Sequence, residues 1–457
     1  MAAHGSDRKY IRMKSSNGLC LGAYNPNAKE NKAFVEFSRH FRSKQINVPQ
    51  VYAVNEEQNI YLVQDLGDTT LFQHMTRERR FGTLTDETIR KHYRRVLRSL
   101  VKLQIHGGKG LNYDLCYPIN HFGKQAMLWD LNYFKYCFLK VEGIPFDETR
   151  LERDFHTLID FLTQADDDYF LYRDFQSRNI MLYNNEVYFI DYQGGRRGAL
   201  QYDVASLLFE PKARLPFELR ETLLQDYLDC LSEEIMVDRS RFIAYYYGFV
   251  YMRTLQALGA YGFRGTVEHK AGFRQSIPLA QRNLKWLSEH VKLPIEIPEV
   301  DLVLQRIMGS KQWGGDEITM PQKLTVNLMS FSYKKSIPQD TTEHGGGFIF
   351  DCRALPNPGR YPEYNAYTGK DTPVIRFFAD KPEMEAFLEH VETLVSYSVK
   401  TYLERDFKHL FVAFGCTGGQ HRSVYCAEQL AKRLLQKFDI EIALTHREQD
   451  EGNLVIK

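Results

Sequence analysis

The feature that most constrains this chain is a pair of short apolar runs, residues 180–183 and 187–190, joined by the Asn-Asn-Glu sequence of residues 184–186. Apolar runs on both sides of turn-forming amides predict a β-hairpin. Because a hairpin reverses the chain, it would return Asp191 to the side of Asn179, although twelve positions separate them. The fold of this segment therefore has to bring the polar residues that precede the first run next to those that follow the second.

The polar residues on both sides of the hairpin have the chemistry that phosphoryl transfer requires. Asn179 and Asp191 offer oxygen ligands to Mg²⁺, and Asp174 can accept the proton of a hydroxyl that attacks the γ-phosphorus of ATP. Arg173 stands beside this base. The alternative is that an Asp followed five residues later by an Asn caps a loop by chance. The hairpin and the second aspartate favour the catalytic interpretation.

These motifs resemble the aminoglycoside phosphotransferase and choline kinase superfamily. With residues 5–12 and 202–208, they most resemble the bacterial N-acetylmuramate/N-acetylglucosamine 1-kinases of cell-wall recycling. The resemblance covers residues 1 to about 290 and implies an α+β bilobal protein-kinase-like domain, with a small lobe over residues 1–66 and a large lobe over residues 67–300. It also implies ATP and Mg²⁺ as cofactors and the anomeric hydroxyl of an amino sugar as the acceptor.

The opening residues are expected to contact the ATP phosphates. Gly5 and Ser6 form a turn whose bare backbone amides can approach a triphosphate, and the alternation that follows places Arg8 and Arg12 on one strand face. The next strand, residues 19–24, has no lysine where protein kinases carry their phosphate-binding one. The arginines are therefore the candidate phosphate contacts. Since only four residues precede Gly5, the resemblance predicts a small lobe that is truncated at its start.

Two further segments are candidate binding surfaces of the kinase-like domain. The resemblance places the backbone groups of Gln64 and Leu66 against the adenine, although an ordinary strand end is the alternative. In the large lobe, Trp129 has the character of a sugar-pocket wall, with core packing as the alternative. For Asp203, the alternative is that it caps a helix. The candidate substrate-binding residues are Trp129, Asp130, Arg196 and Asp203.

A second domain is predicted after residue 320. Prolines and glycines interrupt the helical pattern, so we place a linker over residues 301–320 and the domain over residues 321–457. Within it, an apolar strand over residues 410–415, a glycine-containing loop and an amphipathic helix form a unit that can hold an anion at the helix N-terminus. Phosphate is the expected ligand of this α/β phosphate-binding domain.

Residues 348–358 and 415–424 resemble the C-terminal domain of the RNase adaptor protein RapZ, over about residues 324–447. That family senses glucosamine-6-phosphate and binds a small regulatory RNA, so the resemblance implies a phosphosugar site and raises RNA as a partner. Gly359 and Arg360 stand where the family usually has a histidine. The candidate anion-binding residues are Asp351, Arg353, Cys416, Thr417, Gly418, Gly419, His421, Arg422 and Ser423.

Two alternatives concern this second domain. Cys416 and Arg422 have the spacing of cysteine-dependent phosphatases, in which a thiol at a helix N-terminus attacks phosphorus. No general acid is evident in the sequence, which favours a binding site over a phosphatase. RNA binding has weak support, because residues 439–457 contain five acidic residues against Arg447 and Lys457, and RNA sites need dense positive charge.

Composition fits a two-domain protein without a global charge preference. Of the 457 residues 43% are apolar, and 59 Lys and Arg balance 58 Asp and Glu, so no polyanionic partner is implied for the whole chain. Seven cysteines lack metal-ligand spacing, and no apolar run resembles a membrane span or a signal peptide, so a reducing cytoplasm and no membrane association are expected. The sequence therefore predicts a cytoplasmic amino-sugar kinase joined to a phosphosugar-sensing domain. Two alternatives stay open: a binding-only regulator with an inactive kinase half, and a kinase for an aminoglycoside or choline-type alcohol.

Overall fold

The computed structural model describes most of the chain, in seven segments that comprise residues 8–15, 18–80, 82–313, 324–340, 347–404, 407–449 and 454–456. The chain divides into two compact units, Met1–Ile318 and Thr319–Lys457, and each has its own hydrophobic core. Gly5 and Ser6 lie outside the described residues. The lobe and linker boundaries given above remain predictions.

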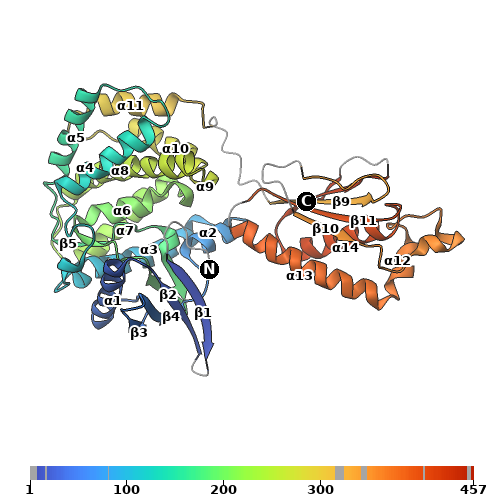
Figure 1. Ribbon diagram of the computed structural model, residues 1–457. Helices are drawn as coiled ribbons and strands as arrows, with labels where there is room; N and C mark the ends of the chain where they lie inside the picture. Colours follow the sequence, from blue (N-terminus) through green and yellow to red (C-terminus); the bar gives the residue numbers. More distant parts are fainter. Residues whose placement is uncertain are drawn as a thin grey trace. The chain divides into compact units, whose positions relative to one another are not determined.

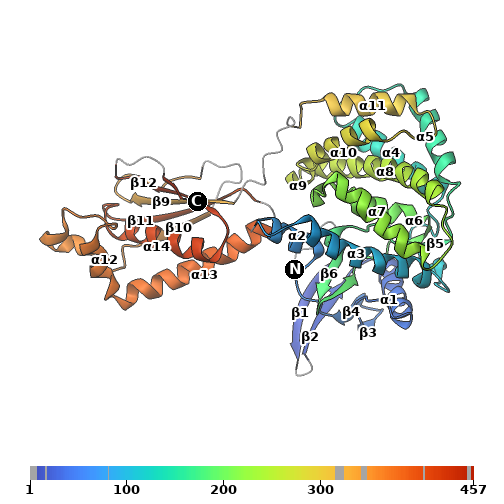
Figure 2. The same cartoon turned by 180° about the vertical axis from the view of Figure 1, so that it is seen from behind.

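The first unit begins with a small lobe that consists of an antiparallel sheet and one helix. Helix α1, Ala28–Ser43, starts at Asn27, whose side chain accepts hydrogen bonds from the amides of Lys29 and Glu30. The sheet and α1 lie together at one end of the unit in both views (Figures 1 and 2). The sheet order is β1-β2-β4-β3, with β1 Lys9–Ser15, β2 Gly18–Tyr24, β3 Val51–Asn55 and β4 Ile60–Gln64.

The large lobe is mainly helical. Helix α8 runs through it and packs against α4, α5, α6 and α10, which makes α8 a scaffold for the loops around it. The helices are α2 Leu71–Arg80, α3 Asp86–Lys102, α4 Lys124–Phe134, α5 Glu148–Leu162, α6 Leu200–Leu208, α7 Phe217–Ser232, α8 Arg239–Tyr261, α9 Ala271–Arg274, α10 Ile277–His290 and α11 Pro298–Gly309.

The predicted hairpin is confirmed. Strands β6, Ile180–Tyr183, and β7, Glu186–Phe189, pair antiparallel, with Ile180 opposite Phe189. The turn residues Asn184 and Asn185 have φ angles of 48° and 58°, as two-residue hairpin turns require. Strands β5, Tyr169–Leu171, and β8, Arg196–Gly198, form a second antiparallel pair.

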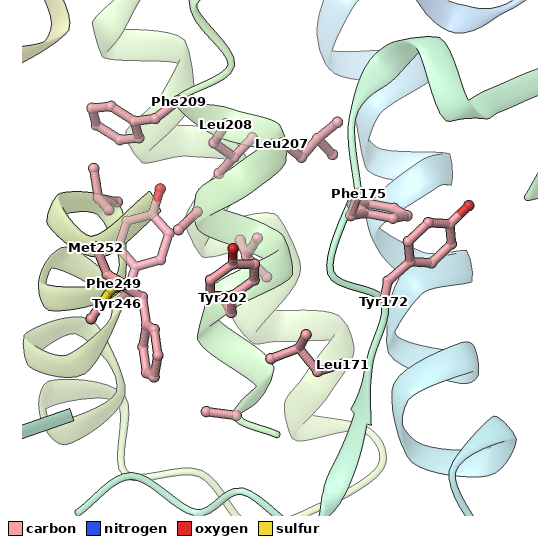
Figure 3. Packing of buried hydrophobic residues seen from close by; sticks show 14 of the residues in the cluster. Leu171, Tyr172, Phe175, Tyr202, Leu207, Leu208, Phe209, Tyr246, Phe249 and Met252 are labelled. Atoms are coloured by element: carbon pink, nitrogen blue, oxygen red, sulfur yellow. The ribbon is translucent and has the colours of Figure 1, made fainter. Parts of the chain in front are cut away.

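The segment between β5 and β6 rests on the core of the large lobe. Leu171, Tyr172 and Phe175 are fully buried, and Figure 3 shows them beside the cluster to which α6 contributes Tyr202 and α8 contributes Phe249. The hydroxyl of Tyr172 donates a hydrogen bond to the carbonyl of Ile190, just before the second polar segment. The apolar residues of this segment therefore fix its backbone, while the side chain of Asp174 stays exposed.

The second unit is an α/β domain, as predicted. Its sheet order is β10-β11-β9-β12-β13, in which the first four strands are parallel and β13 is antiparallel to β12. Helix α14 packs on the sheet, and α13 packs on α14 (Figure 1). The elements are β9 Thr325–Ser332, β10 Gly347–Asp351, α12 Thr372–Ala379, α13 Pro382–Glu404, β11 His409–Cys416, α14 Arg422–Lys437, β12 Glu441–His446 and β13 Leu454–Ile456.

In the part of the chain that the structure describes, no helix combines the length and the apolar character that crossing a membrane requires.

Candidate functional site

Hydrogen bonds around the hairpin bring the three predicted oxygen-bearing residues into one place. The side-chain amide of Asn179 donates to the backbone carbonyl of Asp174 at 2.8 Å, and the backbone amide of Ile190 donates to the carbonyl of Asn179 at 3.1 Å. Asp191 follows directly. The bond from Asn179 uses its amide nitrogen, so it does not consume the carbonyl oxygen that would bind a metal.

The two carboxylates of this group are open to ligands. The side chain of Asp174 is 55% exposed and that of Asp191 is 46% exposed. Arg173 and Asp191 have φ angles of 82° and 66°, in the left-handed region that costs a side-chain-bearing residue on the order of 1 kcal/mol. Strained residues persist where the surrounding structure holds them, and such positions concentrate in functional sites. The strained backbone at Arg173 and Asp191 supports the interpretation of this group as a functional site.

Arg173 is fixed by the large lobe and does not extend toward a ligand. Its guanidinium forms two hydrogen bonds of 2.6 Å with the carboxylate of Asp130 and a further one with the hydroxyl of Tyr202. Asp130 itself is 7% exposed. A bidentate pair of this kind fixes geometry as well as charge. Arg173 and Asp130 therefore orient the backbone next to Asp174, and a sugar contact of Asp130 stays a prediction.

Asp203 is another anchor of the same loop. It is fully buried, and its carboxylate accepts the backbone amides of Tyr172 and Arg173, at 2.8 and 3.1 Å, and the side-chain amide of Gln104 at 3.2 Å. Burial raises the pKa of Asp203 to about 7. Asp203 does not cap a helix, because α6 begins after Ala199 and the carboxylate instead binds the backbone that precedes Asp174. A substrate contact of Asp203 stays a prediction.

Arg8 occupies the centre of the junction between the lobes. It is 3% exposed and forms ion pairs with Glu30 of α1, at 3.5 Å, and with Asp191, at 3.7 Å. In protein kinases a lysine pairs with a glutamate on the helix of the small lobe and holds the ATP phosphates. Strand β2 has no lysine, and Arg8, which directly precedes β1, contacts Glu30 of α1.

Two aspartates engage Arg12, whose predicted contact with phosphate stays a prediction. Its guanidinium binds Asp65 at 2.5 and 2.9 Å and Asp68 at 2.9 and 3.0 Å, which raises its pKa. Asp65 also accepts the amide of Gly67, at 2.9 Å, in the turn that leads into the large lobe. Arg12 therefore ties β1 to the connection between the lobes.

The predicted adenine contacts lie at this same connection. The backbone amide of Gln64 donates to the carbonyl of Gln50 at 2.8 Å, so this amide is engaged within the sheet, and Leu66 is 4% exposed. A contact with adenine would therefore have to use the backbone that follows Gln64. This contact stays a prediction.

The other two predicted substrate residues differ in exposure. Trp129 is 47% exposed, so core packing does not account for it. Arg196 is 7% exposed and donates to the carbonyl of Gly194 at 3.0 and 3.2 Å, and burial together with the charge of Arg173 lowers its pKa. Arg196 thus shapes the loop after Asp191.

One residue of the site had no signal in the sequence. Arg253 of α8 places Nη2 3.9 Å from Oδ1 of Asp174. It lies 79 positions further along the chain, within a helix whose other residues are mainly apolar or aromatic. Only the packing of α8 against α6 shows that it belongs here.

The residues present fit a divalent cation bound together with a phosphate. Asn179 and Asp191 supply two oxygen ligands, and Mg²⁺ in kinases completes its shell with phosphate oxygens and water. Among the described residues no group of three His, Cys, Asp or Glu side chains could by itself hold a metal ion.

In the second unit the predicted anion-binding residues lie at the carboxyl ends of β10 and β11. Asp351 ends β10 and pairs in register with Gly415 of β11. Arg353 binds the carboxylate of Asp351 at 2.6 and 3.0 Å, which lowers the pKa of that aspartate, and lies over the ring of Tyr333. These two charges therefore compensate each other.

Buried side chains hold the loop that follows β11. The thiol of Cys416 is buried, accepts the amide of Gly419 at 3.2 Å and contacts the hydroxyl of Ser423 at 3.2 Å. Arg422 is buried and donates to the carbonyls of Arg353 and Leu355 at 2.8 and 3.2 Å. Arg422 also contacts the hydroxyl of Thr417, at 3.4 Å. His421 binds the carbonyl of Tyr364, and the exposed parts of the loop are Thr417 and Gly418.

A bilobal unit with this loop and hairpin has the architecture of a phosphotransferase. The chain belongs to the phosphotransferase enzyme family, whose family model matches residues 2–235, about half of the chain. The model of the RapZ C-terminal domain matches residues 324–450. Both family resemblances read from the sequence are thereby confirmed, although neither model tests the nearer likeness to amino-sugar kinases.

Curated relatives carry the description nucleotide-binding protein. One from Bifidobacterium adolescentis is 34% identical over 168 residues, which are 37% of this chain and 51% of the relative. One from Halorhodospira halophila is 42% identical over 125 residues, 27% of this chain and 42% of the relative. The chain thus spans about half the length of the curated relatives it matches.

Solved structures with a similar fold include two choline kinases. The choline kinase LicA from Streptococcus pneumoniae is 14% identical, with 62% of this chain and 90% of that chain covered and a TM-score of 0.40. A choline kinase from Cryptosporidium parvum is 12% identical, with 66% and 94% covered and a TM-score of 0.43.

Proposed function

We propose that the first unit transfers the γ-phosphoryl group of ATP to a hydroxyl of an amino sugar, N-acetylmuramate or N-acetylglucosamine, at the anomeric carbon. The observation that carries this proposal is the grouping of Asp174, Asn179 and Asp191 by the hairpin and its two hydrogen bonds. A cytoplasmic location and a role in cell-wall recycling belong to the same proposal.

The residues of the site can perform the reaction as follows. Asp174, open to solvent, accepts the proton of the acceptor hydroxyl while the oxygen of that hydroxyl forms a bond to the γ-phosphorus. The bond between the γ-phosphorus and the bridging β-phosphate oxygen breaks, which releases ADP. Arg173 and Asp203 hold the backbone of Asp174 in place through their contacts in the large lobe. Arg8 places a positive charge where the phosphates of ATP would lie.

Mg²⁺ fits this scheme through Asn179 and Asp191. When bound, it would neutralise charge on the phosphate oxygens. Asp191 has a cationic neighbour in Arg8, at 3.7 Å. Arg8 therefore lies where it could contact both the metal-binding carboxylate and the phosphates.

The test is a substrate panel with ATP and Mg²⁺ on the wild type and on Asp174→Asn. The panel includes both amino sugars, an aminoglycoside and choline. We expect turnover of an amino sugar and a loss of about 10²- to 10⁴-fold in kcat for the variant, the range that a general base contributes. Asp229→Asn serves as the control, because Asp229 is similarly exposed, at 60%, and lies on α7 in an ion pair with Arg239. Activity that survives in Asp174→Asn would remove the base assignment.

The second unit has a separate candidate function, the binding of a phosphosugar. It is supported by the match to the RapZ C-terminal domain and by the exposed loop residues Thr417 and Gly418 in front of the N-terminus of α14. Titration calorimetry with glucosamine-6-phosphate tests it, with glucosamine as the control that lacks the phosphate. RNA as a partner rests on the family match alone.

A further inference from the structure

Arg253 places a nearly buried cation beside the proposed base. Its side chain is 11% exposed, and Nη2 lies 3.9 Å from Oδ1 of Asp174, which is longer than a hydrogen bond. Asp174 is 55% exposed and therefore open to an acceptor. A hydroxyl that donates to Asp174 would lie next to the guanidinium of Arg253.

Neutral groups hold this guanidinium in position. Nε donates to Oγ of Ser206 at 3.0 Å, and Nη1 donates to Oε1 of Gln256. Across the described part of the chain, the one ion pair that Arg253 forms is the long one with Asp174. Glu210 lies buried nearby, but its carboxylate accepts the backbone amide of Ser177 at 2.8 Å. The donors of Arg253 are thus oriented while its charge has little direct compensation.

Two other arginines of the large lobe show how this protein compensates a buried guanidinium. Arg173 forms a bidentate pair with Asp130. Arg220, 3% exposed, lies over the rings of Phe209 and Phe217 at 4.6 and 4.3 Å and has no opening toward a ligand. Arg253 differs from both because it faces an exposed carboxylate. Desolvation of a charge is unfavourable unless a partner of opposite sign approaches it.

We propose that Arg253 binds an anionic group next to Asp174 during turnover. This inference rests on the proposed role of Asp174 as the base. Two groups have the required chemistry: a carboxylate on the acceptor and the phosphoryl group in transfer. Helix α8 packs against the helices α4, α5, α6 and α10 of the large lobe, whereas the cation that faces the nucleotide side, Arg8, comes from the small lobe. This placement favours the acceptor, and hence an acidic sugar.

The test compares two acceptors that differ by one carboxylate-bearing substituent, N-acetylmuramate and N-acetylglucosamine. Both are assayed with the wild type, Arg253→Gln, Arg253→Lys and the control Arg239→Gln, which removes an exposed arginine from the same helix. Slow hydrolysis of ATP by water is measured in parallel, because it needs no acceptor. Binding of ATP by calorimetry shows that each variant is folded.

Each source of the anion gives its own result. If Arg253 binds the acceptor carboxylate, Arg253→Gln lowers kcat/KM for N-acetylmuramate by about 10- to 100-fold, the value of a hydrogen bond to a charged group, and leaves N-acetylglucosamine within threefold. Arg253→Lys then recovers part of the loss. If Arg253 binds the phosphoryl group, kcat falls equally for both acceptors and for hydrolysis.

Two results separate the inference from the proposed function. If the wild type phosphorylates neither sugar, the proposed acceptor is wrong, and the role of Arg253 is upheld only if its glutamine variant hydrolyses ATP at least tenfold more slowly. If Arg253→Gln binds ATP and stays within twofold of the wild type in every reaction that the wild type performs, Arg253 has no role in anion binding.

Discussion

Asp203 makes the stability of the first unit depend on pH in a direction that can be measured. Burial raises the pKa of its carboxyl from 3.8 to about 7. In the unfolded chain the group keeps its low pKa, so between these values the folded state holds a proton that the unfolded state has lost. Stability from this group is therefore complete below pH 3.8 and is lost as the pH rises through 7.

The size of the effect follows from the shift. At 1.36 kcal/mol per pKa unit, ionisation of Asp203 should cost about 2 to 3 kcal/mol of unfolding free energy between pH 5 and pH 8. Asp203→Asn removes the titrating group and keeps one acceptor oxygen for the amides of Tyr172 and Arg173. The free-energy difference between variant and wild type should therefore shift by this amount in favour of the variant as the pH rises.

Urea unfolding of both proteins at half-unit steps of pH measures this difference. Since the chain has two units, the comparison is restricted to the transition that the substitution moves. Asp229→Asn, which removes an exposed carboxylate, should parallel the wild type. A difference between Asp203→Asn and the wild type that stays constant within about 0.5 kcal/mol from pH 5 to pH 8 would refute the burial argument.

Three further substitutions test individual contacts. Arg8→Gln should raise KM for ATP at least about tenfold and weaken ADP binding but not adenosine binding, since it removes the positive charge that would face the phosphates. Equal losses of affinity for ADP and adenosine would contradict this role. Arg12→Gln leaves Asp65 without its cation and should lower the unfolding free energy by about 1 to 3 kcal/mol; an unchanged Tm would argue against the clamp. Cys416→Ser should keep phosphosugar binding in the second unit, and its loss would point to thiol chemistry instead.

Local patterns in the sequence were sufficient for the hairpin. Two apolar runs and a pair of asparagines fix a turn between neighbours in the chain, and the turn then fixes where Asn179 and Asp191 meet. The strand and the helix of the second unit follow the same logic, because a continuous apolar run predicts the strand and an apolar face with the helical period predicts the helix.

Side-chain partners could not be read in the same way. Arg8 and Arg12 alternate on one strand and look equivalent, yet one reaches Glu30 and Asp191 while the other binds the aspartates after β4. The residues around Asp203 in the sequence do not distinguish it from an aspartate at an exposed helix start. Only the packing of the complete fold buries it. Arg253 has no neighbour in sequence that hints at its role. Pairing over long distances along the chain depends on the complete fold, which no local pattern encodes.

The anchoring of the segment after β5 limits which part of the first unit can move. Asp203 holds its amides, the hydroxyl of Tyr172 bonds to Ile190, and its apolar side chains are embedded in the core. A rearrangement of this segment would break several buried contacts at once. Adjustment to a bound nucleotide is therefore expected to come from the exposed side chains of this part of the unit, such as Asp174 and Asp191, while the backbone that carries them stays still.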